Sequence, residues 1–301
     1  MVQLISFFTV LFALAAAPPI SAAPRMDELV ASARPIDWRS LDPENTLYLE
    51  LPAGRVVIEL APEFASNHVA NVKALVREKY FDGLAIIRAQ DNYVVQWGDP
   101  NSEKPDLARK VVKARKTLPP EFEREIDPKA EFTPLPDGDV YAPEVGFSKG
   151  FRVARDPKSG KTWLIHAYGM VGVGRDNAPD SGGGTELYVV IGHAPRHLDR
   201  NVTLLGRVVK GMELLSVMPR GPGAMGFYET ADQRTPIKSI RVAAEVAPSE
   251  RTSVEVLRTD TELFKNLIES RRNRPEEWFA KPAGKIEICN VPIPARVGVK
   301  K

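Results

Sequence analysis

The sequence has little of the side-chain chemistry on which many enzymes depend. Its one cysteine, Cys289, excludes a disulfide within the chain and permits an oxidising compartment without requiring one. No Cys-x-x-Cys pair can occur, so the thioredoxin signal is absent. We expect Cys289 to be an inert thiol.

Metal and phosphate signals are also weak. The four histidines include His193 and His197, but Pro195 between them prevents a regular helix from presenting both to a zinc ion. The run Gly182-Gly183-Gly184 is not followed by the Lys-Ser/Thr pair of a phosphate loop. We expect no metal and no nucleotide cofactor.

The balance of charge excludes a further class. The chain has 41 basic and 39 acidic residues, a net charge of +2 that creates no general field for nucleic acid or acidic membranes. Hydrophobic residues make up 43% and charged residues 27%, as in an ordinary globular protein that buries a core. We therefore expect neither a nucleic-acid partner nor a disordered chain.

Residues 1–23 carry no charged side chain, and the apolar run from Leu4 to Ala17 is too short to span a bilayer comfortably. Small residues at Ala15–Ala17 and Ser21–Ala23 follow it, which suits a cleaved signal peptide. Because no Lys or Arg precedes the run, an uncleaved membrane anchor is the alternative. We predict export, to a bacterial periplasm or the outside, with no stable membrane insertion after cleavage.

Alternation of apolar and polar residues predicts a mainly β protein. Residues 46–51 and 55–60 alternate on either side of Pro52-Ala53-Gly54, which is a hairpin signal. Apolar residues at helical spacing follow Ser66, a candidate N-cap, and residues 210–218 favour a second, short helix. Further strands rich in β-branched residues favour a closed antiparallel barrel; they are 84–89, 92–97, 186–191, 202–209 and 239–246.

The most informative stretch runs from Phe81 to Pro100. Arg88 ends an apolar strand, and a charge at such a place is costly unless it is paired or used. The stretch resembles a strand pair of the cyclophilin peptidyl-prolyl isomerases, with Ile86-Ile87-Arg88 in the first strand and Gln96-Trp97-Gly98-Asp99-Pro100 in the second. Residues 56–83 and 169–211 are similar to other parts of the family, in the family's order.

This resemblance implies a fold and an activity. The fold would be a closed eight-stranded antiparallel cyclophilin-like β-barrel capped by two helices. The activity would be rotation about Xaa-Pro peptide bonds, which requires no cofactor and would assist the folding of exported proteins. The partners would be unfolded or extended proline-containing polypeptides.

The resemblance also implies a site. Arg88 would donate a hydrogen bond to the prolyl nitrogen, and Gln96 would orient its guanidinium. The substrate-binding residues would be Tyr93, Val94, Gly174, Arg175, Glu186, Tyr188, His197 and Leu198. Among the departures from the family, Arg175 replaces an asparagine, Glu186 a glutamine and Val202 a histidine. Glu186 could pair with Arg88 or with Arg175.

We predict a signal peptide at 1–23, an N-terminal linker at 24–44, a cyclophilin-like domain at 45–247 and a C-terminal α/β extension at 248–301. An enlarged insert at 101–168 contains a hairpin signal around Asp156–Gly160, and is either a solvated loop elaboration or a lid that selects substrates. In the extension, Thr259 and Glu262 suggest a capping box, and residues 285–290 a strand that carries Cys289. The extension either packs on the barrel or contacts a partner.

A second function remains open beside the isomerase. The altered Arg175 and Glu186 and the long insert also fit a catalytically weak proline-peptide binding module or chaperone. Retention of Arg88, Gln96 and a full apolar pocket would favour the enzyme.

Overall fold

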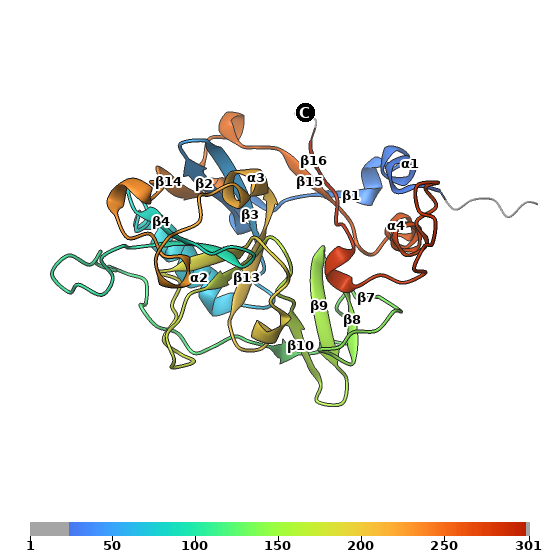
Figure 1. Cartoon of the computed structure of the whole chain (residues 1–301), viewed down its shortest axis with the longest axis horizontal. Helices are drawn as coiled ribbons and strands as arrows, with labels where there is room; N and C mark the ends of the chain where they lie inside the picture. Colours follow the sequence, from blue (N-terminus) through green and yellow to red (C-terminus); the bar gives the residue numbers. More distant parts are fainter. Residues whose placement is uncertain (1–23, 299–301) are drawn as a thin grey trace, which may run out of the picture.

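The computed structural model describes residues 24–298. The predicted signal peptide lies outside the described residues. Within them, no helix is both long and apolar enough to cross a bilayer. Figure 1 shows a large sheet with its helices on the left and a second, smaller sheet with the C-terminal helix α4 on the right.

The large sheet has eight antiparallel strands, most of them in the segments that the sequence predicts as strands from alternation or from β-branched residues. Their order across the sheet is β14 (Ser239–Val242), β2 (Thr46–Leu51), β3 (Gly54–Leu60), β13 (Leu204–Lys210), β11 (Met170–Val173), β12 (Leu187–Val190), β5 (Val94–Gly98) and β4 (Ala85–Ala89). The hairpin predicted at Pro52-Ala53-Gly54 joins β2 to β3. The expectation of a mainly β fold is met.

The prediction of a closed barrel is wrong, because the sheet is an open half-barrel with β14 and β4 as its edges. The chain that leads into β14 approaches β4 through two isolated bridges, Ala85 with Pro236 and Arg88 with Phe227, and a few backbone hydrogen bonds, and it forms no continuous ladder there. Proline has no N–H to donate, so a regular ladder cannot continue through Pro236.

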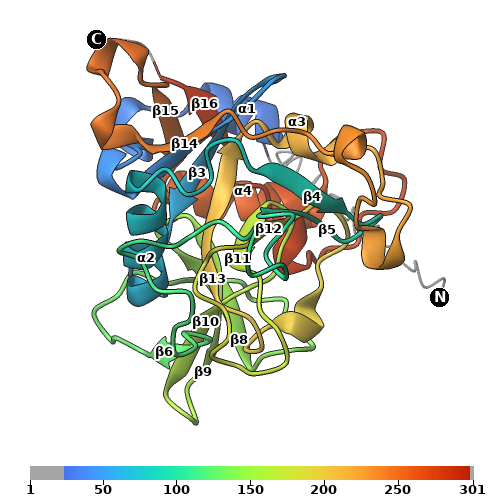
Figure 2. The ribbon, with the colours of Figure 1, turned by 90° about the vertical axis from the view of Figure 1, so that its left-hand side faces the viewer.

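Two helices cover this sheet, α2 (Ser66–Arg77) and the short α3 (Met212–Ser216). Val69, Val72, Leu75 and Val76 of α2 are buried with the inward residues of the strands in one hydrophobic core, and α2 lies along one side of the sheet in Figure 2. Ser66 is not the N-cap that the sequence suggested; it is the first helical residue, after Ala65.

The N-terminus of α2 is capped instead by Glu121, a residue of the insert. Its carboxylate accepts hydrogen bonds from the backbone N–H groups of Asn67 (3.0 Å) and His68 (2.9 Å) and from the His68 ring (2.6 Å). Burial opposes ionisation, but these hydrogen bonds outweigh it and lower the pKa of Glu121 to about 2. The insert is thereby bound to the helix through a negative charge, which the positive end of the helix dipole stabilises.

Replacement of Glu121 by alanine should lower the free energy of unfolding by about 1–2 kcal/mol, the usual effect of a lost N-cap. Since the pKa of Glu121 is depressed, its contribution is complete above the ordinary glutamate value and is lost as the pH falls toward 2. Urea unfolding at pH 7 and pH 3 measures both effects. An equal loss of stability at the two pH values, or none at pH 7, would contradict this role.

The insert forms a second antiparallel sheet of five short strands, wider than the single hairpin predicted. Its order is β6 (Arg124–Glu125), β10 (Lys161–Leu164), β9 (Phe151–Asp156), β8 (Glu144–Ser148) and β7 (Thr133–Pro134). The predicted hairpin is β9 and β10, with Asp156 opposite Lys161 at its end. Asp156 also accepts hydrogen bonds from Lys158 and Ser159 within the turn, as the turn chemistry of this stretch favours.

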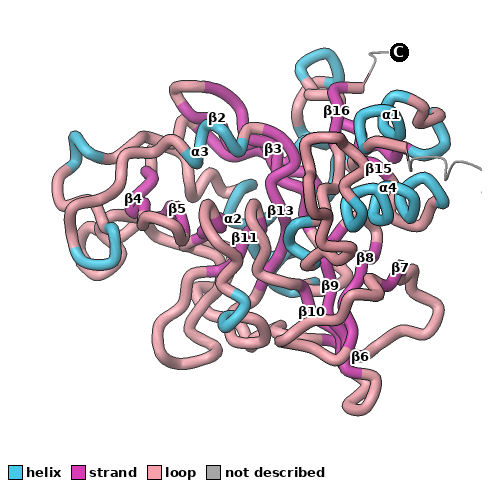
Figure 3. The backbone as a smooth tube through the Cα atoms, turned by 45° about the vertical axis from the view of Figure 1, so that its right-hand side comes forward, coloured by secondary structure: helices cyan, strands magenta, loops and turns pink. Residues whose placement is uncertain are grey.

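The C-terminal extension packs on the second sheet and on the N-terminal residues. Strands β1 (Trp38–Ser40), β15 (Val254–Leu257) and β16 (Ala295–Val297) form a three-stranded antiparallel sheet. Helices α1 (Met26–Ala31) and α4 (Glu262–Asn273) lie side by side next to it in Figure 3. The rings of Phe147 on β8 and Phe264 on α4 meet edge to face, with their centroids 4.9 Å apart, in a shared core.

Two local predictions for the extension are wrong. Thr261, not Thr259, caps α4, because its Oγ1 accepts from the Phe264 N–H at 3.2 Å, while Thr259 is buried and bonded to Gly150. Cys289 is in a 3₁₀-helix rather than a strand. The 3₁₀-helices are η1 (Pro35–Asp37), η2 (Pro43–Asn45), η3 (Arg196–Leu198), η4 (Ala224–Gly226), η5 (Ala231–Gln233), η6 (Ala243–Glu245), η7 (Pro248–Glu250) and η8 (Ile288–Asn290).

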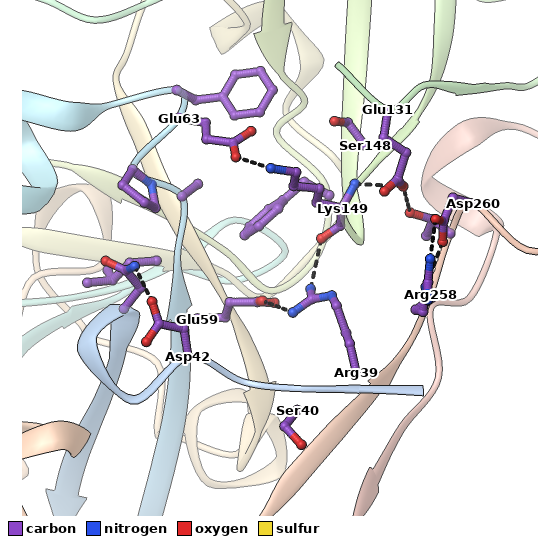
Figure 4. Close-up of a pocket in the computed structure, with 17 residues that line it drawn as sticks. Arg39, Ser40, Asp42, Glu59, Glu63, Glu131, Ser148, Lys149, Arg258 and Asp260 are labelled. Carbon is purple, nitrogen blue, oxygen red and sulfur yellow. Dashed lines mark hydrogen bonds and ion pairs between the residues drawn. The ribbon is translucent and has the colours of Figure 1, made fainter. Parts of the chain in front are cut away.

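The eight-stranded sheet, the five-stranded sheet and the extension meet at a cavity of about 250 Å³. Figure 4 shows its charged lining as side chains that point toward one another: Glu59 to Arg39, and Glu63 to Lys149. Glu59 Oε1 lies 2.6 Å from Arg39 Nη1, and Glu59 Oε2 lies 3.0 Å from Arg207 Nη2. The Glu59 carboxylate therefore joins β3, β13 and the N-terminal strand β1 through two arginines.

Candidate active site

Arg88 lies near the end of the edge strand β4, where the pairing with β5 is irregular. Ile86 faces Trp97 and Arg88 faces Gln96, so one extra residue is accommodated on β4 between these pairs. Such bulges re-aim side chains at the edges of sheets. The result is that Arg88 and Gln96, predicted as partners, are directly opposite, with Arg88 Nη1 donating to Gln96 Oε1 at 3.1 Å.

The Arg88 guanidinium is held on all its nitrogens. Nε donates to the carbonyl oxygen of Met225 at 2.7 Å, and Nη2 donates to the side chain of Gln90. The group also lies 5.5 Å from the ring centroid of Tyr93 and 5.2 Å from that of Phe227. Burial lowers the pKa of Arg88, yet an arginine keeps its charge in proteins. The site thus contains a fixed, half-buried cation.

Gln96 connects this cation to Glu186. Its amide oxygen accepts from Arg88, and its amide nitrogen donates to Glu186 Oε2 at 2.5 Å. Ser102 donates to the other oxygen of Glu186 at 3.3 Å. Gly98 permits this close approach, because a Cβ there would lie 2.6 Å from Glu186 Cγ. The orientation of the Gln96 amide is therefore fixed from both ends.

Glu186 contacts neither of the arginines proposed for it from the sequence. Gln96 lies between Glu186 and Arg88, so no salt bridge draws the guanidinium away. Arg175 donates instead to the carbonyl oxygens of Asn201 (3.0 Å), Asp176 (2.6 Å) and Asn177 (3.2 Å), and so it holds loop backbone together. Gly174 lies against the Glu186 main chain, which accepts its N–H at 2.9 Å.

Replacement of Glu186 by glutamine should stabilise the protein at neutral pH. Burial raises the pKa of Glu186 against the hydrogen bonds of Gln96 and Ser102, so the ionised carboxylate is disfavoured in the folded state. A carboxyl group whose pKa is raised in the folded state lowers the free energy of unfolding when the pH is above the folded-state pKa. It has no such effect when the pH is below the pKa of the unfolded state. We expect a higher melting temperature for Glu186→Gln at pH 7.5, with the difference disappearing by about pH 4. A variant that is less stable at pH 7.5 would contradict it.

An apolar cluster lies next to this polar row. Val94, Tyr188 and Val190 are buried together, and Tyr93 and Val202 pack against them. Tyr93, Val94 and Tyr188 are therefore brought together, as the sequence analysis expected. Val94 and Tyr188 lie on the paired strands β5 and β12, and Tyr93 immediately precedes β5. Leu198, half-buried at the end of η3, is outside this cluster, and His197 is exposed beside it in sequence.

Sequence reasoning missed His166, which is completely buried. Its Nε2 lies 2.9 Å from the Tyr188 hydroxyl, and its Nδ1 lies 3.0 Å from Asp199 Oδ1. No spacing in the sequence predicts this group of three side chains, because Tyr188 lies on β12 and Asp199 follows η3, both far from His166 in the sequence. The sequence analysis placed this histidine only within the insert at 101–168 and gave it no role.

Neither a hydrolase nucleophile nor a metal site is found among the described residues. Residues 146–150 have the Gly-x-Ser-x-Gly spacing of hydrolase nucleophiles, but they lie on the hairpin of β8 and β9 rather than in a strand-to-helix turn. Within residues 24–298, no group of three or more histidine, cysteine or acidic side chains is placed to hold a metal ion.

Comparisons with known proteins agree with one another. The family model described as cyclophilin type peptidyl-prolyl cis-trans isomerase/CLD matches residues 46–244. A protein of Brucella suis biovar 1 named probable peptidyl-prolyl cis-trans isomerase is 28% identical over 207 residues, which cover 68% of this chain and 84% of that protein.

Two further matches differ in their coverage. A Synechocystis protein named putative thylakoid lumen peptidyl-prolyl cis-trans isomerase is 24% identical over 187 residues, 58% of this chain and 44% of that protein. Among solved structures, the cyclophilin AquaCyp293 from Hirschia baltica superposes with a TM-score of 0.71 at 26% identity, over 91% of this chain and 98% of that one. This match therefore extends well beyond the residues of the family model.

Proposed function

This chain belongs to the cyclophilin-type peptidyl-prolyl cis-trans isomerases, and from that premise we propose that Arg88 is the group that acts on the prolyl nitrogen. The barrier to rotation, ~18–20 kcal/mol, comes from amide resonance. A donor that binds the nitrogen lone pair of the twisted amide stabilises the transition state more than the planar ground state.

The observation that carries the proposal is the fixed guanidinium. An arginine has five N–H donors. Among the described residues, three of the Arg88 donors are used, by Met225, Gln96 and Gln90. The remaining two, one on each Nη, are free for a substrate. Because the fork is already oriented, little conformational freedom is lost when it engages the amide.

We propose that the proline ring occupies the apolar surface beside Arg88. Tyr93, Val94 and Tyr188 supply aromatic and branched walls, which suit a ring that must leave water. His197 and Leu198 would border this surface, and Gly174 and Arg175 would shape the loop that meets the peptide backbone. The substrates are then unfolded or extended proline-containing polypeptides, and no cofactor or metal takes part.

We also propose that the protein is exported and acts on other exported chains in a bacterial periplasm. The uncharged, apolar residues 1–23 support export, as does the lumenal name of the Synechocystis relative. Mass spectrometry of the N-terminus of the protein recovered from its native compartment tests this. A mature protein that begins near residue 24 would support it, and an intact Met1 in the soluble cell fraction would refute it.

The isomerase itself is tested by exchange NMR on a short Xaa-Pro peptide, whose uncatalysed isomerisation takes tens to hundreds of seconds. Catalytic amounts of protein should bring the cis and trans resonances into exchange. Line broadening from binding without faster exchange would favour the second function, a proline-peptide binding module. The Glu186 and Arg175 departures would then be the first sites to revert.

A further inference from the structure

A chain of five buried polar side chains connects the insert to the apolar surface beside Arg88. Its members are Asp139, Arg196, Asp199, His166 and Tyr188, and we call it the buried relay. Asp139, Arg196, Asp199 and His166 have side chains exposed by 6% or less. Tyr188 is buried as well. Charges buried this deeply are costly unless each is paired, and here each one is.

The first half of the relay is ionic. Arg196 on η3 donates through both Nη atoms to the two oxygens of Asp139, at 2.8 Å each, and through Nε to Asp199 at 2.6 Å. Such forked pairs fix orientation as well as charge. Arg196 also lies 4.8 Å from the ring centroid of Tyr141, a second residue of the insert. The loop between β7 and β8 thus holds η3 in place.

The second half of the relay has a defined direction of hydrogen bonding. The Asp199 carboxylate can only accept, so the neutral His166 ring carries its proton on Nδ1 and donates it to Asp199. Nε2 is then an acceptor, and the Tyr188 hydroxyl must donate to it. Burial lowers the pKa of His166, although Asp199 opposes this, and Arg196 and His197 also disfavour a second positive charge. The ring is therefore neutral at pH 7.

The Tyr188 ring is closely packed, and its hydroxyl group is anchored by the hydrogen bond to His166. On one side its strand neighbour is Gly172, which has no side chain, and a Cβ there would lie 2.4 Å from the Tyr188 hydroxyl oxygen. On the other side the ring packs with Val94 and Val190 in the apolar cluster. The hydrogen bond to His166 fixes how far the ring extends toward this cluster.

We propose that His166 is a positioning residue of the isomerase, which sets the Tyr188 wall of the proline pocket and makes that wall dependent on the loop between β7 and β8 through Asp199, Arg196 and Asp139. The insert at 101–168 is then more than a loop elaboration, because displacement of Asp139 releases Arg196 and, through Asp199, the histidine. This inference rests on the proposed location of the pocket.

The test is a double-mutant cycle between Tyr188→Phe, which keeps the ring, and His166→Gln. Dissociation constants and exchange rates of the bound Xaa-Pro peptide are measured together by NMR. Each single variant should bind the peptide about 3- to 10-fold more weakly, the size of one lost hydrogen bond, while the exchange rate of bound peptide changes less than about 2-fold. The double variant should be no weaker than the weaker single variant.

Asp139→Asn, at the far end of the relay, should weaken peptide binding in the same direction by a smaller factor. Tyr168→Phe is the matched control, a half-exposed tyrosine two residues beyond His166, and it should leave binding unchanged. Additive effects of Tyr188→Phe and His166→Gln would overturn the proposal. An unchanged dissociation constant in Tyr188→Phe would overturn it even if His166→Gln failed to fold.

A spectroscopic measurement is independent of catalysis. Nitrogen-15 spectra of the His166 ring should show a protonated Nδ1 and a bare Nε2 at pH 7, and Tyr188→Phe should shift the Nε2 signal alone. A protonated Nε2 would overturn the proposal. If these spectra were as expected but the wild-type protein did not catalyse isomerisation, the proposed function would be refuted. The buried relay would then have only a structural role.

Discussion

Replacement of Arg88 by lysine should lower the catalytic efficiency on an Xaa-Pro peptide by about 10²–10³-fold, the usual loss when an oriented transition-state donor is removed. Lysine retains the charge but not the rigid fork. It cannot at once bind Gln96, the Met225 carbonyl and the prolyl nitrogen, as the Arg88 guanidinium is arranged to do. The measurement is the rate of cis-trans exchange as a function of peptide and protein concentration.

The control for this experiment is Arg272→Lys on α4. Arg272 is also a forked arginine, bonded to both oxygens of Asp137 at 2.7 Å, but it lies in the C-terminal helix. The Arg272→Lys variant should keep the wild-type rate of cis-trans exchange. If Arg88→Lys retained more than about a tenth of the activity, charge alone would suffice and the oriented-donor mechanism would be wrong.

Replacement of Glu59 by glutamine should cost about 3–5 kcal/mol of unfolding free energy, the effect of breaking a buried ion pair from one side. Glu59 is 7% exposed, and its two oxygens serve two arginines, Arg39 and Arg207. A neutral amide leaves both guanidinium groups without their counter-charge where β1, β3 and β13 meet. Thermal unfolding, followed by circular dichroism, measures the loss.

Glu50→Gln is the matched control, on the neighbouring strand of the same hairpin. Glu50 pairs with Arg55 at 2.6 Å, but both side chains are more than a quarter exposed, so we expect a loss below about 1 kcal/mol. Similar losses for the two variants would show that burial does not strengthen the Glu59 contacts. A Glu59 variant with full stability would mean that the N-terminal strand is held by its backbone pairing alone.

The sequence predicted those features that local patterns encode. Alternation located β2 and β3, and runs rich in β-branched residues located β4, β5, β12, β13 and β14. The pairing of Arg88 with Gln96 followed from the resemblance of two adjacent strands to a known family. The open edges of the sheet were not predicted, because strand propensity does not show which strands will be left at an edge. Pro236, which interrupts the approach of β14 to β4, was visible as a residue but not as a neighbour of Ala85.

What the sequence could not predict are side chains that act far from their own strand or helix. Glu121 caps a helix that begins at Ser66, and His166 lies between Tyr188 and Asp199. Neither pairing has a periodicity, so only the folded chain reveals it. Cys289 shows the opposite error: apolar alternation suggested a strand, but the Glu287 side chain accepts the Cys289 N–H at 2.8 Å and favours a tight turn.

The pairing of β1 with β15 can form only late in folding. Trp38 lies opposite Leu257, so a strand that is synthesised early finds its partner only when nearly all of the chain has followed. Contacts so distant along the chain form slowly. Strands β4 and β5, which carry Arg88 and Gln96, pair with each other within residues 85–98, so this pair can form before the two ends of the chain meet. A nascent chain would therefore place Arg88 opposite Gln96 before its two ends are joined.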